Sequence, residues 1–266
     1  MSKTSFLRKV NTNKDLFYVA HEGIEKNFPI HSHNKHQLYY LEGGAAYFNT
    51  PRKSFFVPAN HFLWIPAGLE HNIIFRTKAK MVHNIYIPTI LKTSNPSLET
   101  NAGIYPVTNL LAEMINYTLS WKGEIGNDDQ EKFQFLITLN NVIASAANLP
   151  LPIALPTTNN ESLSEIVKYI HRNIDQPLSL DYIAEKFSYS TRTLSRLFQN
   201  NLNTSFLQYV KLTRIIKAME LLLQTDLSIS EITFKCGYNN LSSFSYVFHK
   251  TVNISPADFR KKTKSK

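Results

Sequence analysis

The sequence is poor in the features that would tie it to an oxidising compartment or to a membrane. Its single cysteine, Cys236, cannot form an internal disulfide, and no apolar run approaches the ~20 residues that span a bilayer. The first residues, MSKTSFLRKVNTNKDLF, lack the apolar core and small-residue cleavage site of a signal peptide. We therefore expect a cytoplasmic protein with no membrane partner.

Composition also excludes disorder. Hydrophobic residues make up 43% of the chain and charged residues 18%, which is typical of a globular protein. At 266 residues the chain has room for one or two domains.

Positive charge is spread unevenly along the chain, whose net charge is +9. Residues 158–266 contain 15 Lys and Arg against 9 Asp and Glu, whereas residues 1–157 contain 14 against 11. A basic C-terminal part indicates a polyanionic partner, although the charge could simply keep the protein in solution. Seven of the nine histidines lie before residue 84, so we expect the two parts to do different work.

The first 90 residues predict a β domain. Residues 36–49, 53–68 and 71–87 are short runs rich in aromatic and β-branched side chains, punctuated by glycine and proline. Closely spaced runs of this kind favour a sandwich or a barrel.

Residues 105–148 predict two helices. Apolar side chains recur at helical spacing within residues 105–121 and again within residues 128–147. Such stripes must be buried, either on the barrel of the same chain or against a second subunit. We expect the second arrangement, which would make the protein a homodimer.

A proline-rich segment then separates this part from the rest. Three prolines between residues 150 and 156 cannot sustain a helix and are typical of a stiff linker. We therefore predict an N-terminal domain at residues 1–148, a linker at 149–160 and a separate C-terminal domain at 161–266.

The last segment is helical and contains an internal repeat. Leu178 and Ile183 match Leu227 and Ile232 at an offset of 49, and the later halves of the two copies match at an offset of 50. Each copy predicts a short helix, a tight turn and a second helix, with one long helix between the copies. In the second turn, Gly237 can take a positive φ at no steric cost.

This repeated unit has the pattern of a helix-turn-helix, whose second helix enters the major groove and reaches base edges near its start. Arginine is the usual bidentate reader of guanine, and only the first copy has arginine there. We therefore expect mainly phosphate contacts from the second copy; the alternative for each polar residue is a solvated helix face. The predicted DNA-contacting residues are Arg192, Thr193, Ser195 and Arg196 in the first copy and Leu241, Ser242, Ser245 and Tyr246 in the second.

Residues 163–262 resemble the DNA-binding domain of the AraC/XylS family of bacterial transcription regulators, most clearly in ISEITFKCGYNNLSSFSYVFHKTVNISPADFRK. The resemblance implies two helix-turn-helix units, joined by a long helix, that read successive major-groove turns of double-stranded DNA. It also implies transcriptional control through contact with RNA polymerase or through occlusion.

A few positions depart from the family pattern. Asn203 and Asn253 stand where glycine is usual, and asparagine is the next-best residue for a left-handed helix cap. Thr233 stands where alanine is common, so its hydroxyl needs a partner. Cys236 is predicted to fill the core.

The N-terminal segment resembles a cupin barrel, the sensor domain common in this family. HSHNKHQLYYLEGG looks like the first cupin motif, with His31, His33 and Gln37 where a metal-binding cupin has two histidines and a glutamate. IPAGLEHNIIF looks like the second motif, with His71 as the third histidine. Residues i and i+2 of a strand share a face, so His31 and His33 should point inward together and His36 outward.

Two kinds of occupant stay open for this pocket. Three imidazoles suit Zn, Ni, Cu or Fe, which makes a divalent transition metal a candidate cofactor. Gln37 in place of a carboxylate removes a charge and weakens such a site. Alternatively, the histidines hydrogen-bond a small organic effector, with His31, His33, Gln37 and His71 lining the pocket in either case.

The sequence does not identify the effector, the operator or the direction of control, but it favours one interpretation. We predict an α+β multidomain protein with a cupin-like β-barrel, a two-helix dimerisation segment and an all-α double helix-turn-helix domain. It would be a sequence-specific transcription regulator that responds to a small ligand or a metal. The alternatives are a metal-dependent cupin enzyme and a ligand-independent DNA-binding regulator.

Overall fold

The computed structural model describes residues 3–22, 28–77 and 79–264. The chain divides into two compact units, and each is described by itself. The N-terminal unit consists of Met1–Thr50 and Val57–Leu151, and the C-terminal unit of Pro51–Phe56 and Pro152–Ser265.

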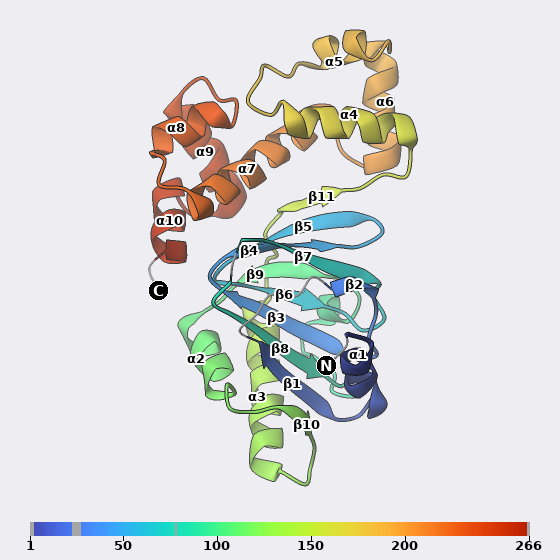
Figure 1. Cartoon of the computed structure of the whole chain (residues 1–266), viewed down its shortest axis with the longest axis vertical. Coiled ribbons are helices and arrows are strands. Elements are labelled where there is room, and N and C mark those ends of the chain that lie inside the picture. Colours follow the sequence, from blue (N-terminus) through green and yellow to red (C-terminus); the bar gives the residue numbers. More distant parts are fainter. Residues whose placement is uncertain (1–2, 23–27, 78, 265–266) are drawn as a thin grey trace. The chain divides into compact units, whose positions relative to one another are not determined.

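Two β-sheets dominate the first half of the chain (Figure 1). Sheet A has six strands in the order β10-β1-β8-β3-β6-β9, and sheet B has five in the order β11-β5-β4-β7-β2. The strands are β1 (Phe17–Glu22), β2 (Phe28–His31), β3 (His36–Glu42), β4 (Ala45–Asn49), β5 (Lys53–Pro58), β6 (His61–Ile65), β7 (His71–Thr77), β8 (Met81–Ile87), β9 (Gly103–Pro106), β10 (Gly123–Ile125) and β11 (Ala154–Pro156).

The sequence predicts a cupin-like β-barrel, and the structure forms this β-rich domain as two open sheets. Among the described strands, sheet A ends at β10 and β9 and sheet B ends at β11 and β2, with no pairing that joins the two sheets into one cylinder. The broader prediction, a β-rich N-terminal domain followed by a helical domain, is confirmed.

Sheet A has two different faces, because side chains alternate along each strand. In β3, Leu38 and Tyr40 belong to a core that contains α2 (Asn109–Tyr117) and α3 (Gln130–Ala146). Gln37 and Tyr39 line a cavity on the opposite face. The helix-covered face thus forms one apolar core, and the opposite face lines a cavity.

The two helices of residues 105–148 are shorter than predicted, and their apolar stripe packs on the chain's own sheet. Leu111, Ile115 and Leu136 lie in the same core as Trp64 of β6. The expectation that a second subunit buries this stripe is therefore wrong for these residues. The start of the first predicted helix is strand β9 instead, because it pairs with β6 at the edge of sheet A.

The predicted linker also holds a strand. Leu155 of β11 pairs with Ser54 of β5, and Pro156 ends the strand. Proline is tolerated there because β11 is the edge strand of sheet B. On its outer side no neighbouring strand needs a backbone N–H donor.

The remaining described helices are α1 at the N-terminus, the short 3₁₀ helix η1, and seven helices of the C-terminal unit (Figure 1). None of the helices in the described part of the chain is long and apolar enough to cross a membrane. The bounds of these remaining helices are α1 (Lys3–Thr12), η1 (Pro96–Glu99), α4 (Glu161–Arg172), α5 (Leu180–Lys186), α6 (Thr191–Leu202), α7 (Phe206–Gln224), α8 (Ile229–Lys235), α9 (Leu241–Val252) and α10 (Pro256–Lys264).

Local sequence explains how the helices of the C-terminal unit begin and end. Ser179 and Ser190 cap α5 and α6 by accepting hydrogen bonds from backbone N–H groups. Asn203 and Asn253 end α6 and α9 with φ of 51° and 62°, which confirms the predicted left-handed caps. The predicted repeat is thus two copies of short helix, turn and second helix, joined by the 19-residue helix α7.

The two departures that the sequence raised inside this unit are accommodated. The hydroxyl of Thr233 donates to the carbonyl oxygen of Ile229 at 2.8 Å, so it is not left unpaired. Cys236 is fully buried as predicted, and burial raises the pKa of its thiol to about 12.

Candidate functional site

Three histidines meet at the junction of β2 and β7. His31 ends β2 and lies opposite His71, the first residue of β7. The ring centroids of His31 and His71 are 4.2 Å apart, and that of His33 lies 5.2 Å from His71 and 6.1 Å from His31. One ring nitrogen from each histidine lies within 4.8 Å of the other two.

His33 belongs to the cluster, but from a position in the chain that strand alternation did not predict. It lies beyond the end of β2, in the turn before β3, so it shares no strand face with His31. The carbonyl oxygen of His33 accepts a hydrogen bond from the N–H of Gly68 at 2.8 Å. This bond ties the turn to the loop that precedes His71.

Backbone carbonyl oxygens orient all three rings. A carbonyl oxygen can only accept, so each Nδ1 carries the proton and each Nε2 presents a lone pair. The Nδ1 atoms of His31, His33 and His71 lie 2.8, 2.7 and 2.8 Å from the carbonyl oxygens of Pro29, Lys35 and Leu69. This is the outer-shell arrangement that fixes the tautomer of metal-binding histidines.

Gln37 completes the cluster from β3. Its Oε1 lies 2.8 Å from Nε2 of His33, and its Nε2 donates to Oδ1 of Asn84 at 2.7 Å. Neutral His33 has only one N–H, so it cannot donate both to Lys35 and to Gln37. Either the Gln37 amide is flipped so that its NH₂ group donates to Nε2 of His33, or a cation binds both Nε2 of His33 and Oε1 of Gln37.

Burial lowers the pKa of all three histidines and so favours their neutral forms. Desolvation, with a smaller contribution from the neighbouring imidazoles, lowers the pKa of His71 to about 3. Desolvation also lowers the pKa of His33 to about 4. Among the described residues, the buried Nε2 of His71 has no hydrogen-bond partner. His71 therefore offers a lone pair on Nε2 that the described residues do not use.

A small cavity lies beside the cluster, between the two sheets. His31 and Gln37 contribute to its wall, together with Tyr39, Asn84 and Tyr86. Its volume is about 30 Å³, which is room for about two water molecules. Glu22 is the charged residue of its lining. The cavity in this state has room for an ion with water.

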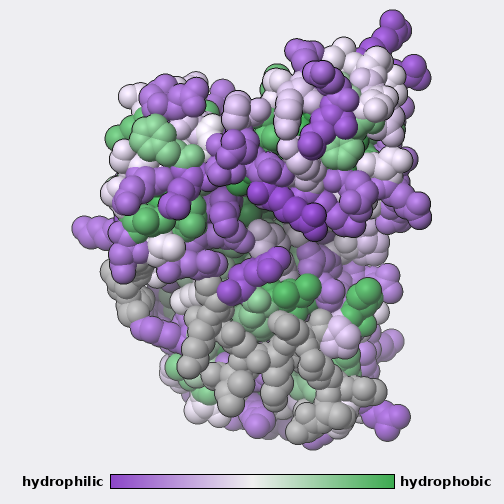
Figure 2. All heavy atoms as spheres, turned by 45° about the horizontal axis from the view of Figure 1, so that its top comes forward, coloured by the Kyte–Doolittle hydropathy of each residue, from purple (hydrophilic) through white to green (hydrophobic). Residues whose placement is uncertain are grey.

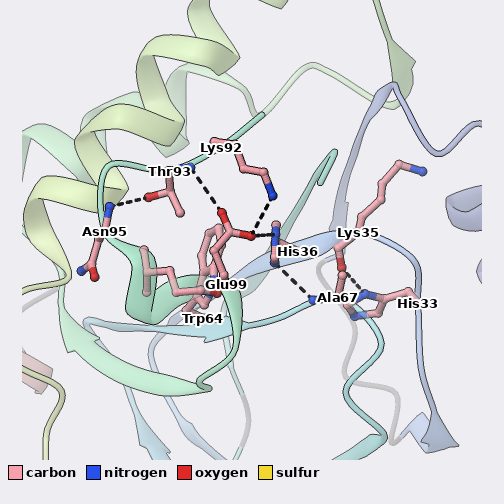
Figure 3. A network of polar contacts seen from close by, with 10 residues as sticks. His33, Lys35, His36, Trp64, Ala67, Lys92, Thr93, Asn95 and Glu99 are labelled. Carbon is pink, nitrogen blue, oxygen red and sulfur yellow. Dashed lines mark hydrogen bonds and ion pairs between the residues drawn. The ribbon is translucent and has the colours of Figure 1, made fainter. Parts of the chain in front are cut away.

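His36 is buried, so the prediction that it points outward is wrong (Figure 3). Its ring stacks on Trp64, its Nδ1 accepts a hydrogen bond from the N–H of Ala67 at 3.2 Å, and its Nε2 lies 3.4 Å from Oε2 of Glu99. His36 does face away from Gln37, as strand alternation requires. That face is covered by η1, which carries Glu99, and no pattern in the sequence predicts that η1 lies there.

Two polar features of β8 had no predicted role. Asn84 holds Gln37, and the only sequence signal for it is a polar residue between apolar ones in residues 81–87. His83 lies 3.0 Å from Nδ1 of His21 and 3.0 Å from the carboxylate of Glu42. These contacts join β1, β8 and β3 on the helix-covered face.

The predicted DNA-contacting residues lie in the first two turns of α6 and α9. The four predicted residues of α6 are all exposed: Arg192, Thr193, Ser195 and Arg196. In α9, Leu241, Ser242 and Tyr246 are exposed and Ser245 is half-buried. Figure 2 shows the helices of the C-terminal unit turned forward, with hydrophilic side chains over most of their surface and apolar side chains only in small patches.

Family models match both parts of the chain. Residues 183–262 match a helix-turn-helix domain, and residues 13–87 match the AraC-like ligand-binding domain. The matched families and relatives are transcription regulators, not enzymes.

Relatives align with this chain over about 100 residues. The transcriptional regulator GbdR of Pseudomonas aeruginosa is 38% identical over 103 residues, which cover 39% of this chain and 28% of that protein. The transcriptional activator RhaS of Salmonella schwarzengrund is 32% identical over 104 residues, covering 39% and 37%. The chain thus spans less than two fifths of the length of the curated relatives it matches.

Solved structures include an AraC-type DNA-binding regulator from Chromobacterium violaceum. It is 36% identical over 39% of this chain and 92% of that one, with a TM-score of 0.37.

Proposed function

Because the chain belongs to the AraC family of DNA-binding transcription regulators, we propose that it controls transcription in response to a divalent transition metal bound by His31, His33 and His71. The N-terminal unit would be the sensor and the C-terminal unit the DNA reader. Such a protein would work where the chromosome lies, in the cytoplasm.

One observation carries the choice of a metal over an organic effector. The Nε2 of His71 is buried and unpartnered among the described residues, and one ring nitrogen from each of His31, His33 and His71 lies within 4.8 Å of the other two. A buried acceptor without a donor costs about 1 to 3 kcal/mol, and a metal ion on this nitrogen removes that cost. Imidazole nitrogens with one neutral amide oxygen suit Zn, Ni, Cu or Fe better than Ca or Mg.

The residues divide the work between holding an ion and orienting its ligands. His31, His33 and His71 would hold the ion through Nε2, with Oε1 of Gln37 as a fourth donor. The ion would supply a fixed positive charge to a pocket that is otherwise neutral apart from Glu22. The Pro29, Lys35 and Leu69 carbonyl oxygens keep the ring nitrogens aimed, and Asn84 keeps Gln37 in place.

DNA reading is proposed for α6 and α9. Arg192 and Arg196 are long, always charged and exposed near the start of α6, which supports base contacts there. Ser242 and Tyr246 in α9 offer hydroxyl groups suited to phosphates. Membership of this family supports RNA polymerase as a proposed partner.

A homodimer is part of the proposal, with a second copy of this chain on the outward side of α2. Leu110 and Tyr117 on this helix are 61% and 58% exposed, and Leu119 follows at 45%. Apolar side chains grouped on one helix favour a partner surface. Sedimentation of wild type and of Leu110→Lys tests it: a wild-type monomer would remove this part of the proposal.

The first experiment is metal content by mass spectrometry on untagged protein purified without chelator. We expect about one equivalent of a transition metal per chain, lost in His31→Ala and in His71→Ala. His61→Ala is the matched control, because His61 is also a buried histidine of the N-terminal unit but lies in sheet A, outside the cluster. Metal-free wild type that stays metal-free after reconstitution would overturn the metal, and an organic effector would become the leading alternative.

The second experiment tests the response. Duplexes selected from a randomised library by the full chain are titrated with metal-loaded and metal-free protein. A metal-dependent change in DNA affinity, absent in His71→Ala, supports a metal-responsive regulator. Equal affinity in both states would favour a regulator that binds DNA independently of a ligand.

A further inference from the structure

Two helix-turn-helix units on one chain read DNA together only if their separation is fixed. Successive major-groove turns on one face of B-DNA are about 34 Å apart, and each base pair rotates the groove by roughly 34°. If the joint between the two helix-turn-helix units bent freely, the protein would bind DNA sites of many spacings, each weakly, because ordering the joint on binding costs affinity. This inference rests on the proposed reading of DNA by α6 and α9.

The helix α7 carries both units on its surface. At its start, Phe206 and Tyr209 pack edge-to-face against Phe198 of α6, with ring centroids 5.4 and 5.7 Å away. Farther along, α7 contacts α8, α9 and α10, and Figure 1 shows α7 running between the two groups of helices. Each unit is therefore attached to α7, but packing on one helix does not by itself join the units to each other.

Arg214, in the middle of α7, makes that join. On the side of the first unit, its Nε donates to the carbonyl oxygen of Ile174 at 3.4 Å and its Nη2 donates to that of Gln176 at 3.0 Å. Both carbonyls belong to the segment between α4 and α5. On the side of the second unit, the guanidinium lies over the ring of Tyr238, 5.5 Å from its centroid.

The contact reaches the second recognition helix through one further ring. Tyr238 is in the turn between α8 and α9 and packs edge-to-face on Phe244 of α9, with centroids 5.4 Å apart. A flat guanidinium can donate sideways to two carbonyls while its face covers an aromatic ring. A lysine ammonium at this place has neither the fork nor the flat face.

Gly237 brings the two units close enough for this contact. A Cβ on Gly237 would lie 2.5 Å from the carbonyl oxygen of Ile174 and 2.7 Å from Nη2 of Arg214. The turn of the second unit thus lies directly against the segment that leads into the first unit. No side chain fits between them, which is a second reason for glycine besides its φ of +75°.

We propose that Arg214 is a positioning residue that fixes the separation of the two recognition helices and thereby sets the DNA spacing this regulator accepts. It acts through Ile174, Gln176 and Tyr238 and need not touch DNA. Arg192 and Arg196 would determine which bases are read, and Arg214 would determine how far apart the two sets of bases lie.

The test uses the full chain and duplexes that wild type selects from a randomised library. Affinity is measured for the selected duplex, for duplexes with one base pair inserted or deleted between the two protected segments, and for a duplex with only the first segment. The variants are Arg214→Lys and Arg214→Ala. Arg172→Lys is the matched control, because Arg172 is exposed at the end of α4 and lies outside this contact.

For wild type and Arg172→Lys, we expect a one-base-pair change to weaken binding at least about tenfold, since it turns and shifts one groove relative to the other. For both Arg214 variants, we expect this discrimination to fall to about twofold, with unchanged affinity for the one-segment duplex. Discrimination that stays at the wild-type level in Arg214→Lys and Arg214→Ala would overturn the inference.

Equal losses on every duplex, including the one-segment duplex, would also overturn it and make Arg214 a general stability or phosphate residue. A wild-type chain that selects no sequence would instead overturn the proposed DNA-reading function itself. The two failures are distinguishable, because one appears in wild type and the other only in the variants.

Discussion

The rings of His31 and His71 lie 4.2 Å apart, centroid to centroid, across the pairing of β2 with β7. Both are bound at Nδ1 by a carbonyl oxygen two residues earlier in the chain, Pro29 and Leu69. Two neutral imidazoles held this closely, with a third beside them, form a donor set before any ligand arrives. Because folding has already ordered these ligands, metal binding loses little free energy to ordering them.

Metal addition should stabilise the N-terminal unit. A ligand that binds only the folded state at about 100 times its Kd adds about 2.7 kcal/mol to the free energy of unfolding. We expect Zn²⁺ or Ni²⁺ to raise the thermal midpoint of metal-stripped protein and a chelator to reverse the change. His71→Ala should show no rise, and a rise of equal size in that variant would place the metal elsewhere.

Acid should destabilise the protein through His83, which lies away from the cluster. Burial lowers the pKa of His83 to about 4, from 6.5, and outweighs the Glu42 carboxylate 3.0 Å from its Nε2, so the unfolded chain binds this proton more readily than the folded one. The resulting stability is fully present above pH 6.5 and is lost as the pH falls toward 4, by about 1 to 2 kcal/mol at pH 5.

Urea unfolding of metal-stripped protein between pH 7.5 and pH 5 measures this loss. His83→Asn should flatten the decline, and His249→Asn, an exposed change in α9, should leave it as in wild type. A His83→Asn protein as acid-sensitive as wild type would contradict the assignment.

Arg196→Ala should affect DNA reading at one position of the operator. If Arg196 contacts a guanine, its loss costs about 1 to 3 kcal/mol at that base pair and leaves other positions unchanged. Binding to a panel of single-base operator variants measures this. A uniform loss over all sequences, with a smaller dependence on salt, would make Arg196 a phosphate contact instead.

Glu99→Ala should destabilise the N-terminal unit more than Lys92→Ala. The Nδ1 of His36 accepts from the Ala67 N–H, so the proton lies on Nε2, 3.4 Å from Oε2 of Glu99. This contact falls short of a hydrogen bond, but removing the carboxylate takes a negative charge away from a buried N–H, at a cost of about 1 kcal/mol.

Lys92 is 80% exposed and 3.9 Å from Glu99, and exposed ion pairs of this kind contribute at most about 1 kcal/mol. Denaturant unfolding of the two variants measures the difference. Equal destabilisation would mean that the Glu99 carboxylate does not support His36.

Gly237→Ala should destabilise the C-terminal unit more than Asn203→Ala. Both changes place alanine at a left-handed φ, which costs about 1 to 2 kcal/mol. Only at Gly237 does the new methyl group overlap a backbone oxygen, that of Ile174. Thermal unfolding of the two variants should separate them, and equal midpoints would mean that the Ile174 segment moves away without cost.

Local chemistry made the C-terminal unit predictable from its sequence. Ser179 and Ser190 cap helices because their hydroxyls accept the first free N–H groups, and Asn203, Asn253 and Gly237 tolerate the left-handed conformation that ends or turns a helix. Each of these preferences depends on neighbours within a few residues, so the sequence alone determined the two repeated units and the helix between them.

Contacts between distant segments decided the rest. His36 is buried because η1 covers the face it occupies, and His33 joins the cluster because the loop before His71 binds its backbone. The apolar stripe of Leu111 and Ile115 has the same spacing whether it faces a sheet or a second subunit, and only packing chose the sheet. Periodicity predicts which side chains are buried. Which surface buries them depends on the relative free energies of packing against segments that lie far apart in the chain.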